Sequence, residues 1–339
     1  MSRLRTGVRI GRLGVALAAV LLTTAPACRR QAAPAKAETT RAAAPHEVRI
    51  GYQRSSWAFL ALRHEGSLEA RLAPLGAKVK WLEFPAGPAI LEGINVGSVD
   101  IALVGDAPPI FAQAGGFHFA YAAVEPPKPR AAAIIVLPDS PLSRVADLKG
   151  KKVGVPKGSS AHHLLIESLV AAGLSWKDIV PVYLAPPDGR AAFETGRIDA
   201  WAIWDPLFAA AELQLKARLL DNPQGGFSYQ QFFVVRPQLV AEHRASYEAL
   251  MAAVAETDRR INEHPAEVAA ALAADARVDV AILARALARG AFGVQPLTEP
   301  VWREQQRLAD MFADLKLVPK IADVRTAALP APVAEAERR

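Results

Sequence analysis

The chain has 339 residues, and 51% of them are hydrophobic, which is enough to bury the cores of two domains or lobes. Its formal net charge is +6, but four of the positive charges are arginines within residues 1–27, so the remainder carries a nearly balanced +2. This balance argues against nucleic acid as a partner. The single cysteine excludes an intrachain disulfide or a multi-cysteine metal site, and we predict neither a metal nor a cofactor.

The N-terminal segment has the organisation of a secretory signal peptide. The four arginines precede an apolar run, Leu13 to Leu22, that is too short to span a bilayer comfortably. Ala25-Pro26-Ala27 then precedes Cys28, so we predict a signal peptide over 1–27 and lipidation of Cys28 as in a bacterial lipoprotein. Ala25 stands where such signals usually have leucine, and ordinary cleavage after Ala27 is the alternative. Residues 28–46, rich in alanine, proline and charge, are predicted to be a flexible tether.

Short strands and helices alternate between Val48 and Val124, which predicts a parallel sheet with helices on both faces. The stretch Glu125–Pro129 contains three prolines and stops the pattern, because proline is excluded from helix interiors and central strands. We interpret this stretch as a crossing from a first lobe to a second. The predicted strands cover 48–53, 78–82, 99–104 and 117–124, and the predicted helices cover 57–72, 89–95 and 108–113.

A second alternating series follows the crossing. Its predicted strands cover 131–137, 152–155, 179–184 and 198–203, with helices over 188–195 and 206–215 and a further helix that begins at Ser159 or Ser160. The apolar and aromatic stretch 227–235 is interpreted as the return crossing, and 239–315 is predicted to be helical with breaks near Pro265, Gly293 and Pro296. The predicted organisation is a first lobe of 47–125 plus 237–325, a second lobe of 126–236 and a C-terminal tail of 326–339.

Two α/β lobes joined by two crossings enclose a cleft, and ligands of such sheets bind beyond the carboxyl ends of the strands. Four segments occupy predicted strand ends, namely Tyr52-Gln53, Gly105-Asp106, Gly158-Ser159-Ser160 and Trp204-Asp205. The third follows a strand and a small-residue turn and begins a helix, where unpaired N–H groups and the helix dipole favour an anion. The alternative is that Ser159 and Ser160 only cap the helix.

Several short blocks in the chain resemble those of the aliphatic sulfonate-binding proteins of ABC importers. The resemblance runs in order from about Val48 to Arg325. It rests on the blocks Gly51-Tyr52-Gln53, Glu83-Phe84-Pro85-Ala86-Gly87-Pro88, Asn95-Val96-Gly97-Ser98, Gly105-Asp106, Glu125-Pro126-Pro127-Lys128-Pro129, Asp147-Leu148-Lys149-Gly150, Lys157-Gly158-Ser159-Ser160 and Asp199-Ala200-Trp201-Ala202-Ile203-Trp204-Asp205-Pro206.

This resemblance implies a two-lobed, type II-like periplasmic-binding fold that closes on its solute and delivers it to a membrane permease. It implies capture of alkanesulfonates for sulfur uptake by a monomeric periplasmic protein. Relatives in the same group bind taurine, nitrate and thiamine precursors, and sulfate esters are a further alternative. Family members are usually freely periplasmic, so a lipid anchor at Cys28 would be a departure.

A sulfonate has three acceptor oxygens and therefore needs several N–H and O–H donors and no nearby carboxylate. The turn Gly158–Ala161 is the predicted anion site, and His162 either adds a donor or lies exposed in the first helical turn. Gln53 offers donors and an acceptor. Asp106 either holds a polar group at the far end of the ligand or, as we favour, caps the helix that begins at Pro108.

The remaining candidates concern the rest of the ligand. Trp201 and Trp204 lie on a strand and are three residues apart, so at most one need face the cleft, and we favour Trp204 because it is nearer the carboxyl end. A tryptophan there would pack on the alkyl part of a ligand. Arg190 either pairs with the sulfonate or lies on a helix surface.

Two other functional classes were weighed against solute binding, which involves no catalysis. The same fold carries desulfination and pyrimidine synthesis, but a cysteine nucleophile would have to be Cys28, which lies in the signal or tether. Ser160 and His162 are adjacent at a helix start, a poor arrangement for a serine and its base with Asp205, and no Gly-x-Ser-x-Gly motif is present. A sensor domain of a membrane receptor lacks support because no later segment predicts a membrane span.

Overall fold

The computed structural model describes residues 45–221, 227–321 and 323–330. The predicted signal peptide, Cys28 and nearly all of the predicted tether lie outside these residues. Within the described part of the chain, no helix has both the length and the apolar character that crossing a membrane requires.

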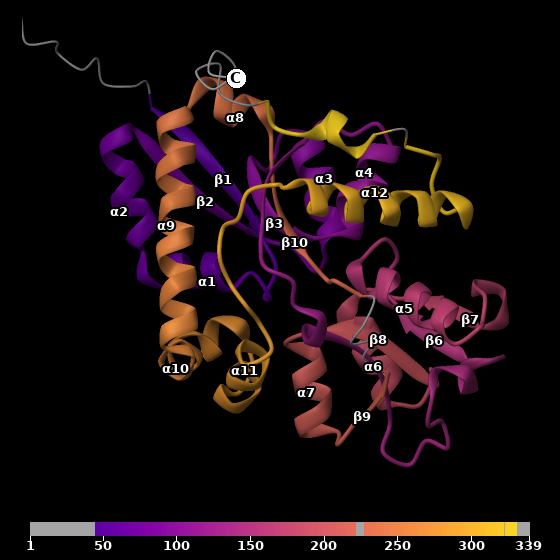
Figure 1. The fold of residues 1–339 in the computed structure, drawn as a ribbon. Helices are drawn as coiled ribbons and strands as arrows, with labels where there is room; N and C mark the ends of the chain where they lie inside the picture. The colour runs from indigo at the N-terminus through magenta and orange to yellow at the C-terminus, as the bar shows by residue number, and fades with distance from the viewer. Residues whose placement is uncertain (1–44, 222–226, 322, 331–339) are drawn as a thin grey trace, which may run out of the picture. The chain divides into compact units, whose positions relative to one another are not determined.

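The first of two sheets contains β1 (His46–Tyr52), β2 (Ala77–Glu83), β3 (Ile101–Gly105), β4 (Ala120–Val124) and β10 (Gln231–Val235). Their spatial order is β2-β1-β3-β10-β4. Figure 1 labels β1, β2, β3 and β10 of this sheet. β1 runs parallel to β2 and β3, whereas β10 is antiparallel to both β3 and β4. Four strands therefore share one direction and β10 opposes them.

The second sheet repeats this plan with β5 (Ala132–Val136), β6 (Lys152–Val155), β7 (Val180–Tyr183), β8 (Ala200–Trp204) and β9 (Arg218–Asp221). Their order is β7-β6-β8-β5-β9, and β5 is the reversed strand because it is antiparallel to β8 and β9. Each lobe is thus mostly parallel with one strand reversed, as the α/β two-lobed prediction requires.

Helices cover both faces of the first sheet, and the strand pattern shows why. Ile101 and Leu103 of β3 point into one apolar cluster, whereas Ala102 and Val104 point into another on the opposite face. In the first lobe the helices are α1 (Trp57–Glu65), α2 (Ser67–Leu72), α3 (Gly87–Asn95), α4 (Ala107–Ala114), α8 (Pro237–Glu242), α9 (Arg244–Glu263), α10 (Pro265–Ala276), α11 (Val280–Leu287) and α12 (Glu299–Asp314). In the second lobe they are α5 (Ser160–Ala171), α6 (Pro186–Glu194) and α7 (Leu207–Gln214).

The return crossing lies earlier than the sequence predicted. Stretch 227–235 was interpreted as crossing backbone, but Gln231–Val235 is β10, a fully buried inner strand of the first sheet. The boundary of the second lobe at 236 is therefore wrong, and the described part of the crossing is 227–230. The first crossing is hydrogen-bonded to the stretch 227–235, because Glu125 N donates to Gln231 O of β10 at 2.8 Å and Lys128 N donates to Tyr229 O of the return crossing at 2.9 Å.

Smaller differences have local causes. The helix predicted over 57–72 is two helices, because Gly66 adopts a left-handed conformation with φ of 63° and ends α1. The strand β9 was not predicted. The first lobe continues beyond Arg325, since Leu329 N donates to Tyr121 O at 2.9 Å.

Candidate functional site

Two neighbouring cavities lie between segments of both lobes, beyond the ends of the sheets. The inner cavity has a volume of about 10 Å³, room for about one water molecule. The outer cavity is much larger, at about 490 Å³, and shares Gln53, Ser55 and Trp204 with the inner one. The inner cavity is lined by Gln53, Ser55, Gly87, Gly105, Pro108, Ser159, Ser160, Trp204, Tyr229 and Gln231.

Four helices begin at the inner cavity. Gly87 and Ser160 are the first residues of α3 and α5, Pro108 is the second residue of α4, and Ser55 lies just before α1. The first N–H groups of a helix lack intrahelical partners, and the dipole makes that end positive. None of the residues that line this cavity is charged. The cavity therefore offers neutral donors and helix dipoles to an anion.

Two hydroxyl groups in this wall have no partner among the residues that the structure describes. Ser55 Oγ and Ser160 Oγ are buried and make no hydrogen bond to any of these residues. Buried polar atoms without partners are uncommon and call for an explanation. Both residues line the inner cavity, so a ligand with acceptor oxygens would satisfy them.

The sequence left open whether the two serines at the start of α5 cap the helix or bind the ligand, and the structure gives each serine one of these roles. Ser159 is the N-cap, because its Oγ accepts from His162 N at 3.3 Å and donates to Pro156 O at 2.7 Å. The Ser160 hydroxyl takes no part in capping and remains for the cavity. Gly158 adopts φ of 69°, a conformation that glycine permits in the preceding turn.

Gly105 permits the close approach of the two lobes. It ends β3 in the first lobe, and a Cβ atom added to it would lie 1.9 Å from Ser160 Oγ of the second lobe. Any larger residue at this position would therefore have to push the Ser160 side chain or the second lobe away.

Two glutamines and a tyrosine complete the polar wall. Gln53 Nε2 donates to Leu103 O at a long 3.4 Å, and Gln231 Oε1 accepts from Lys128 Nζ at 2.8 Å. Tyr229 is buried, and its pKa is raised well above the usual value of tyrosine by burial and by nearby carboxylates. Its phenol is therefore a neutral donor at physiological pH.

Asp106 does not face the inner cavity with a free carboxylate. Its Oδ1 accepts from Ala107 N at 2.8 Å, which caps α4 as favoured from the sequence, and its Oδ2 lies 2.8 Å from His163 Nδ1. Burial opposes the imidazolium form, but Asp106 and Glu167 together raise the pKa of His163 to about 9. The pair Asp106–His163 is thus an ion pair at neutral pH that joins the first lobe to α5 of the second.

His162, predicted as a possible ligand donor, lines neither cavity. It is buried among aromatic rings, with Trp176 at 4.7 Å and Phe312 at 5.8 Å between ring centroids. Burial, and then the charges of Lys157 and His163, lower its pKa to about 4. The neutral ring accepts a hydrogen bond from Gly158 N at 3.3 Å through Nδ1. His162 therefore stabilises the turn that precedes Ser160 through a hydrogen bond on the side away from the cavity.

The predicted residues at the end of β8 take different positions. Trp204 lines both cavities, whereas Trp201 is completely buried beside Phe193 in the core of the second lobe. Asp205 lines neither of these cavities, because its Oδ1 accepts from Ala209 N at 2.9 Å and from Arg289 Nη1 at 3.1 Å. Burial raises the pKa of Asp205 to about 6 even though Arg289 lowers it.

Two further predicted residues lie outside the inner cavity. Tyr52 is buried with its ring packed edge-on against Trp81 at 6.1 Å, and it lines neither cavity. Arg190 lines the outer cavity and is bonded to Glu194 at 2.7 Å and Gln214 at 2.8 Å.

The outer cavity has a different character from the inner one. Its walls are mainly apolar, and its charged members form bonded groups, since Glu83 accepts from Arg54 at 3.0 Å and from Arg277 at 3.2 Å. Apart from the three shared residues it is lined by Arg54, Glu83, Phe84, Pro85, Pro186, Pro187, Arg190, Pro206, Leu207, Ala276, Arg277 and Val278.

Sequence reasoning missed five residues of the inner cavity: Ser55, Gly87, Pro108, Tyr229 and Gln231. Ser55 carried a usable signal, because it follows a strand and precedes a helix just as Ser159 does. Tyr229 and Gln231 were not predicted as lining residues because the stretch that contains them was interpreted as a crossing between lobes.

Comparison with known proteins supplies an independent observation. Residues 90–268 match the protein family described as NMT1/THI5 like. The chain is 41% identical over 282 residues to the "Putative aliphatic sulfonates-binding protein" of Escherichia coli K12, which covers 83% of this chain and 88% of that protein.

Two solved structures agree in sequence and fold. The alkanesulfonate-binding protein SsuA from Xanthomonas axonopodis pv. citri, bound to MOPS, is 40% identical with a TM-score of 0.80, over 86% of this chain and all of that one. The periplasmic aliphatic sulphonate binding protein SsuA from Escherichia coli is 40% identical with a TM-score of 0.74, over 84% of this chain and 98% of that one.

Proposed function

This chain belongs to the NMT1/THI5-like family, and we propose that it is the solute-binding component of an ABC importer that captures aliphatic sulfonates. The observation that carries the proposal is the inner cavity, where two buried hydroxyls without partners among the described residues, Ser55 Oγ and Ser160 Oγ, lie among four helix N-termini. A sulfonate remains fully ionised and has only acceptor oxygens, so donors without a carboxylate suit it. The names of the relatives at about 40% identity support the same ligand class.

The outer cavity favours a sulfonate with an organic tail over a small inorganic anion. Nitrate or sulfate would leave the apolar walls around Pro186, Leu207 and Val278 without a partner. The alkyl part of a sulfonate could pass Trp204, which lines both cavities, and bury its surface there. Taurine is less well matched, because its ammonium group would meet Glu83 already bonded to Arg54 and Arg277.

We propose binding without catalysis. A serine nucleophile at Ser160 has no base in place. His162 Nδ1 already accepts from Gly158 N, and although burial lowers the pKa of His163, Asp106 and Glu167 raise it to about 9, so that His163 is protonated at neutral pH. Incubation with an alkanesulfonate should therefore leave the ligand unchanged and release no sulfite, as measured by chromatography.

Calorimetric titration of the mature chain tests the ligand class directly. The titrants are a series of alkanesulfonates, taurine, sulfate, nitrate, phosphate and a thiamine precursor. We expect alkanesulfonates to bind most tightly and to raise the free energy of unfolding by about 2.7 kcal/mol at one hundred times the dissociation constant. Tighter binding of nitrate or of a thiamine precursor would contradict the proposal.

The remaining proposals concern the cellular setting. We propose a periplasmic protein, as the SsuA relative from Escherichia coli is named, that is monomeric and delivers its solute to a permease. The N-terminal pattern adds the proposal that Cys28 is lipidated. A Cys28→Ala variant should then leave the membrane fraction and lose an acyl label, and an unmodified, soluble wild-type protein would contradict the anchor.

A further inference from the structure

A lysine is buried directly behind the inner cavity. Lys128 belongs to the first crossing, and its side chain is 3% exposed. Its ammonium group contacts the Glu125 carboxylate and Gln231 Oε1, and it lies 4.6 Å from the centroid of the Phe292 ring. A fully buried lysine is rare, and this one is held by partners from the first crossing, from β10 and from the C-terminal half of the first lobe.

A small third cavity shows how close this lysine lies to the ligand wall. It has a volume of about 10 Å³, and Lys128 is one of the residues that line it. Ser55, Tyr229 and Gln231 line both this cavity and the inner cavity. Lys128 is therefore separated from the inner cavity by a single layer of side chains.

The bond to Lys128 fixes the orientation of the Gln231 carboxamide. An ammonium group can only donate, so the carboxamide must turn its oxygen toward Lys128. The Gln231 Nε2 group, which donates to no acceptor among the described residues, is left for the inner cavity. A donor is the group that a sulfonate needs from this residue.

We propose, on the basis of the sulfonate-binding function above, that Lys128 is a positioning residue for the anion. It holds the Gln231 carboxamide with Nε2 toward the inner cavity, and it places a buried positive charge behind the sulfonate. Glu125 sets the strength of that charge, because its carboxylate contacts the same ammonium group.

The surroundings of Lys128 make this charge effective. In a buried environment the attraction between charges is stronger than in water, so a cation one side chain away from the anion contributes to affinity. Asp258 on α9 is a second acidic group that interacts with Lys128. Burial, and then the charge of Glu125, raise the pKa of Asp258 to about 8, so it is mainly protonated at pH 7 and does not cancel the lysine.

The test compares the affinity of purified full-length variants for hexanesulfonate by calorimetry at pH 7. Glu125→Gln removes the competing carboxylate and should tighten binding severalfold, an effect that a purely structural role of this pair would not produce. Glu125→Gln/Lys128→Met removes both charges, a replacement that buried ion pairs tolerate. It should bind at least tenfold more weakly than Glu125→Gln.

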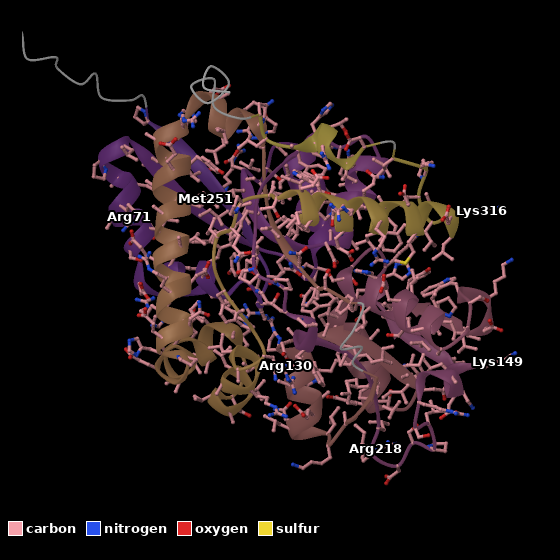
Figure 2. All side chains as sticks on the ribbon, viewed as in Figure 1. Arg71, Arg130, Lys149, Arg218, Met251 and Lys316 are labelled. Atoms are coloured by element: carbon pink, nitrogen blue, oxygen red, sulfur yellow. The ribbon has the colours of Figure 1, made fainter. Side chains whose placement is uncertain are left out.

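Two further variants complete the experiment. Gln231→Glu keeps the shape of the side chain and its bond to Lys128, but it turns a carboxylate oxygen toward the inner cavity. The variant should therefore not bind sulfonate, although it should still unfold cooperatively. Lys149→Met is the control for the loss of one positive charge, because Lys149 is 74% exposed and lies at the outer edge of the second lobe (Figure 2). It should bind with wild-type affinity.

The outcomes separate this inference from the proposed function. If the wild-type protein binds no sulfonate, the proposed function is wrong and the inference falls with it. If the wild-type protein binds but the double variant equals Glu125→Gln in affinity, or Gln231→Glu still binds, Lys128 does not position the anion. Circular dichroism of each variant verifies that a loss of binding is not a loss of fold.

Discussion

The inner and outer cavities share three residues but recognise a ligand by different means. The inner cavity is small, lined by uncharged residues and built from helix starts, and buried hydrogen bonds orient Gln231 and Ser159 in its wall. The outer cavity is large and apolar, with paired charges at Glu83 and Arg190. The difference indicates that the anionic head is selected by geometry, so small changes there should be severe. The tail binds through the apolar surface that it buries, so substitutions in the outer cavity should change affinity in proportion to the area lost.

The largest expected effect comes from closing the inner cavity at its narrowest point. In Gly105→Val the new Cβ would meet Ser160 Oγ, so the lobes could not approach as they do here. We expect no measurable sulfonate binding in calorimetry. Small-angle scattering should show no decrease in the radius of gyration when ligand is added, whereas the wild-type protein should become more compact. Wild-type affinity in this variant would show that closure at Gly105 is unnecessary.

The next effect separates the two serines at the start of α5. Ser160→Ala should weaken sulfonate binding by about 10- to 100-fold, because one hydrogen bond to a charged group is worth about 1.5–3 kcal/mol. Ser159→Ala is the matched control, because Ser159 caps the helix. It should lower the free energy of unfolding by about 1 kcal/mol and affect binding less. Equal effects of the two variants on affinity would remove the distinction between cap and ligand donor.

A smaller effect is expected from pH. The pKa of His163 is about 9 in this closed arrangement, and the ordinary value of histidine is near 6.5. Because the pKa of His163 is raised, protonated His163 stabilises the closed arrangement in full at pH values below its ordinary pKa. This stabilisation is lost as the pH rises through 9. His163 contacts two carboxylates, and only the contact with Asp106 joins the two lobes, because Glu167 lies on α5 with His163. Only the contribution of Asp106 to the raised pKa therefore depends on closure. We therefore expect about tenfold weaker binding at pH 9 than at pH 7.

The sulfonate itself does not titrate in this range, so the protein must cause the change. His163→Gln should lose less affinity than the wild-type protein between pH 7 and pH 9, and what it does lose should come from Asp258, whose pKa is about 8. A wild-type profile as flat as that of the variant would show that this ion pair does not contribute to closure.

The smallest effect is expected in the outer cavity. Each methylene buried on binding contributes at most about 0.8 kcal/mol, so affinity should rise about two- to fourfold per carbon from ethanesulfonate to hexanesulfonate. Leu207→Ala should reduce the affinity for hexanesulfonate severalfold and leave that for ethanesulfonate unchanged. If both ligands lose equally, Leu207 supports the head site and the cavities are not independent.

Local patterns predicted much of the inner cavity. Gln53, Gly105, Ser160 and Trp204 were identified because each lies at or just after the carboxyl end of a strand, where α/β sheets place ligands. The cap at Ser159 was identified from the turn before it. These features depend on neighbouring residues, so a single sequence contains them.

Long-range pairing could not be predicted in the same way. The apolar stretch 227–235 shows that the segment is buried, but not that Gln231–Val235 pairs with β3, more than one hundred residues away. Gln231 was therefore missed as a wall residue. The buried ion pair of Asp106 with His163 was missed for the same reason, since it appears only when α4 and α5 meet.

The small volume of the inner cavity has a kinetic consequence. With room for about one water molecule, the inner cavity has to widen before it takes up a sulfonate group, and we expect this widening to come from separation of the lobes. The fraction of time spent separated then scales the apparent dissociation constant. In stopped-flow experiments the observed association rate should level off at high ligand concentration, at a value equal to the rate of lobe opening.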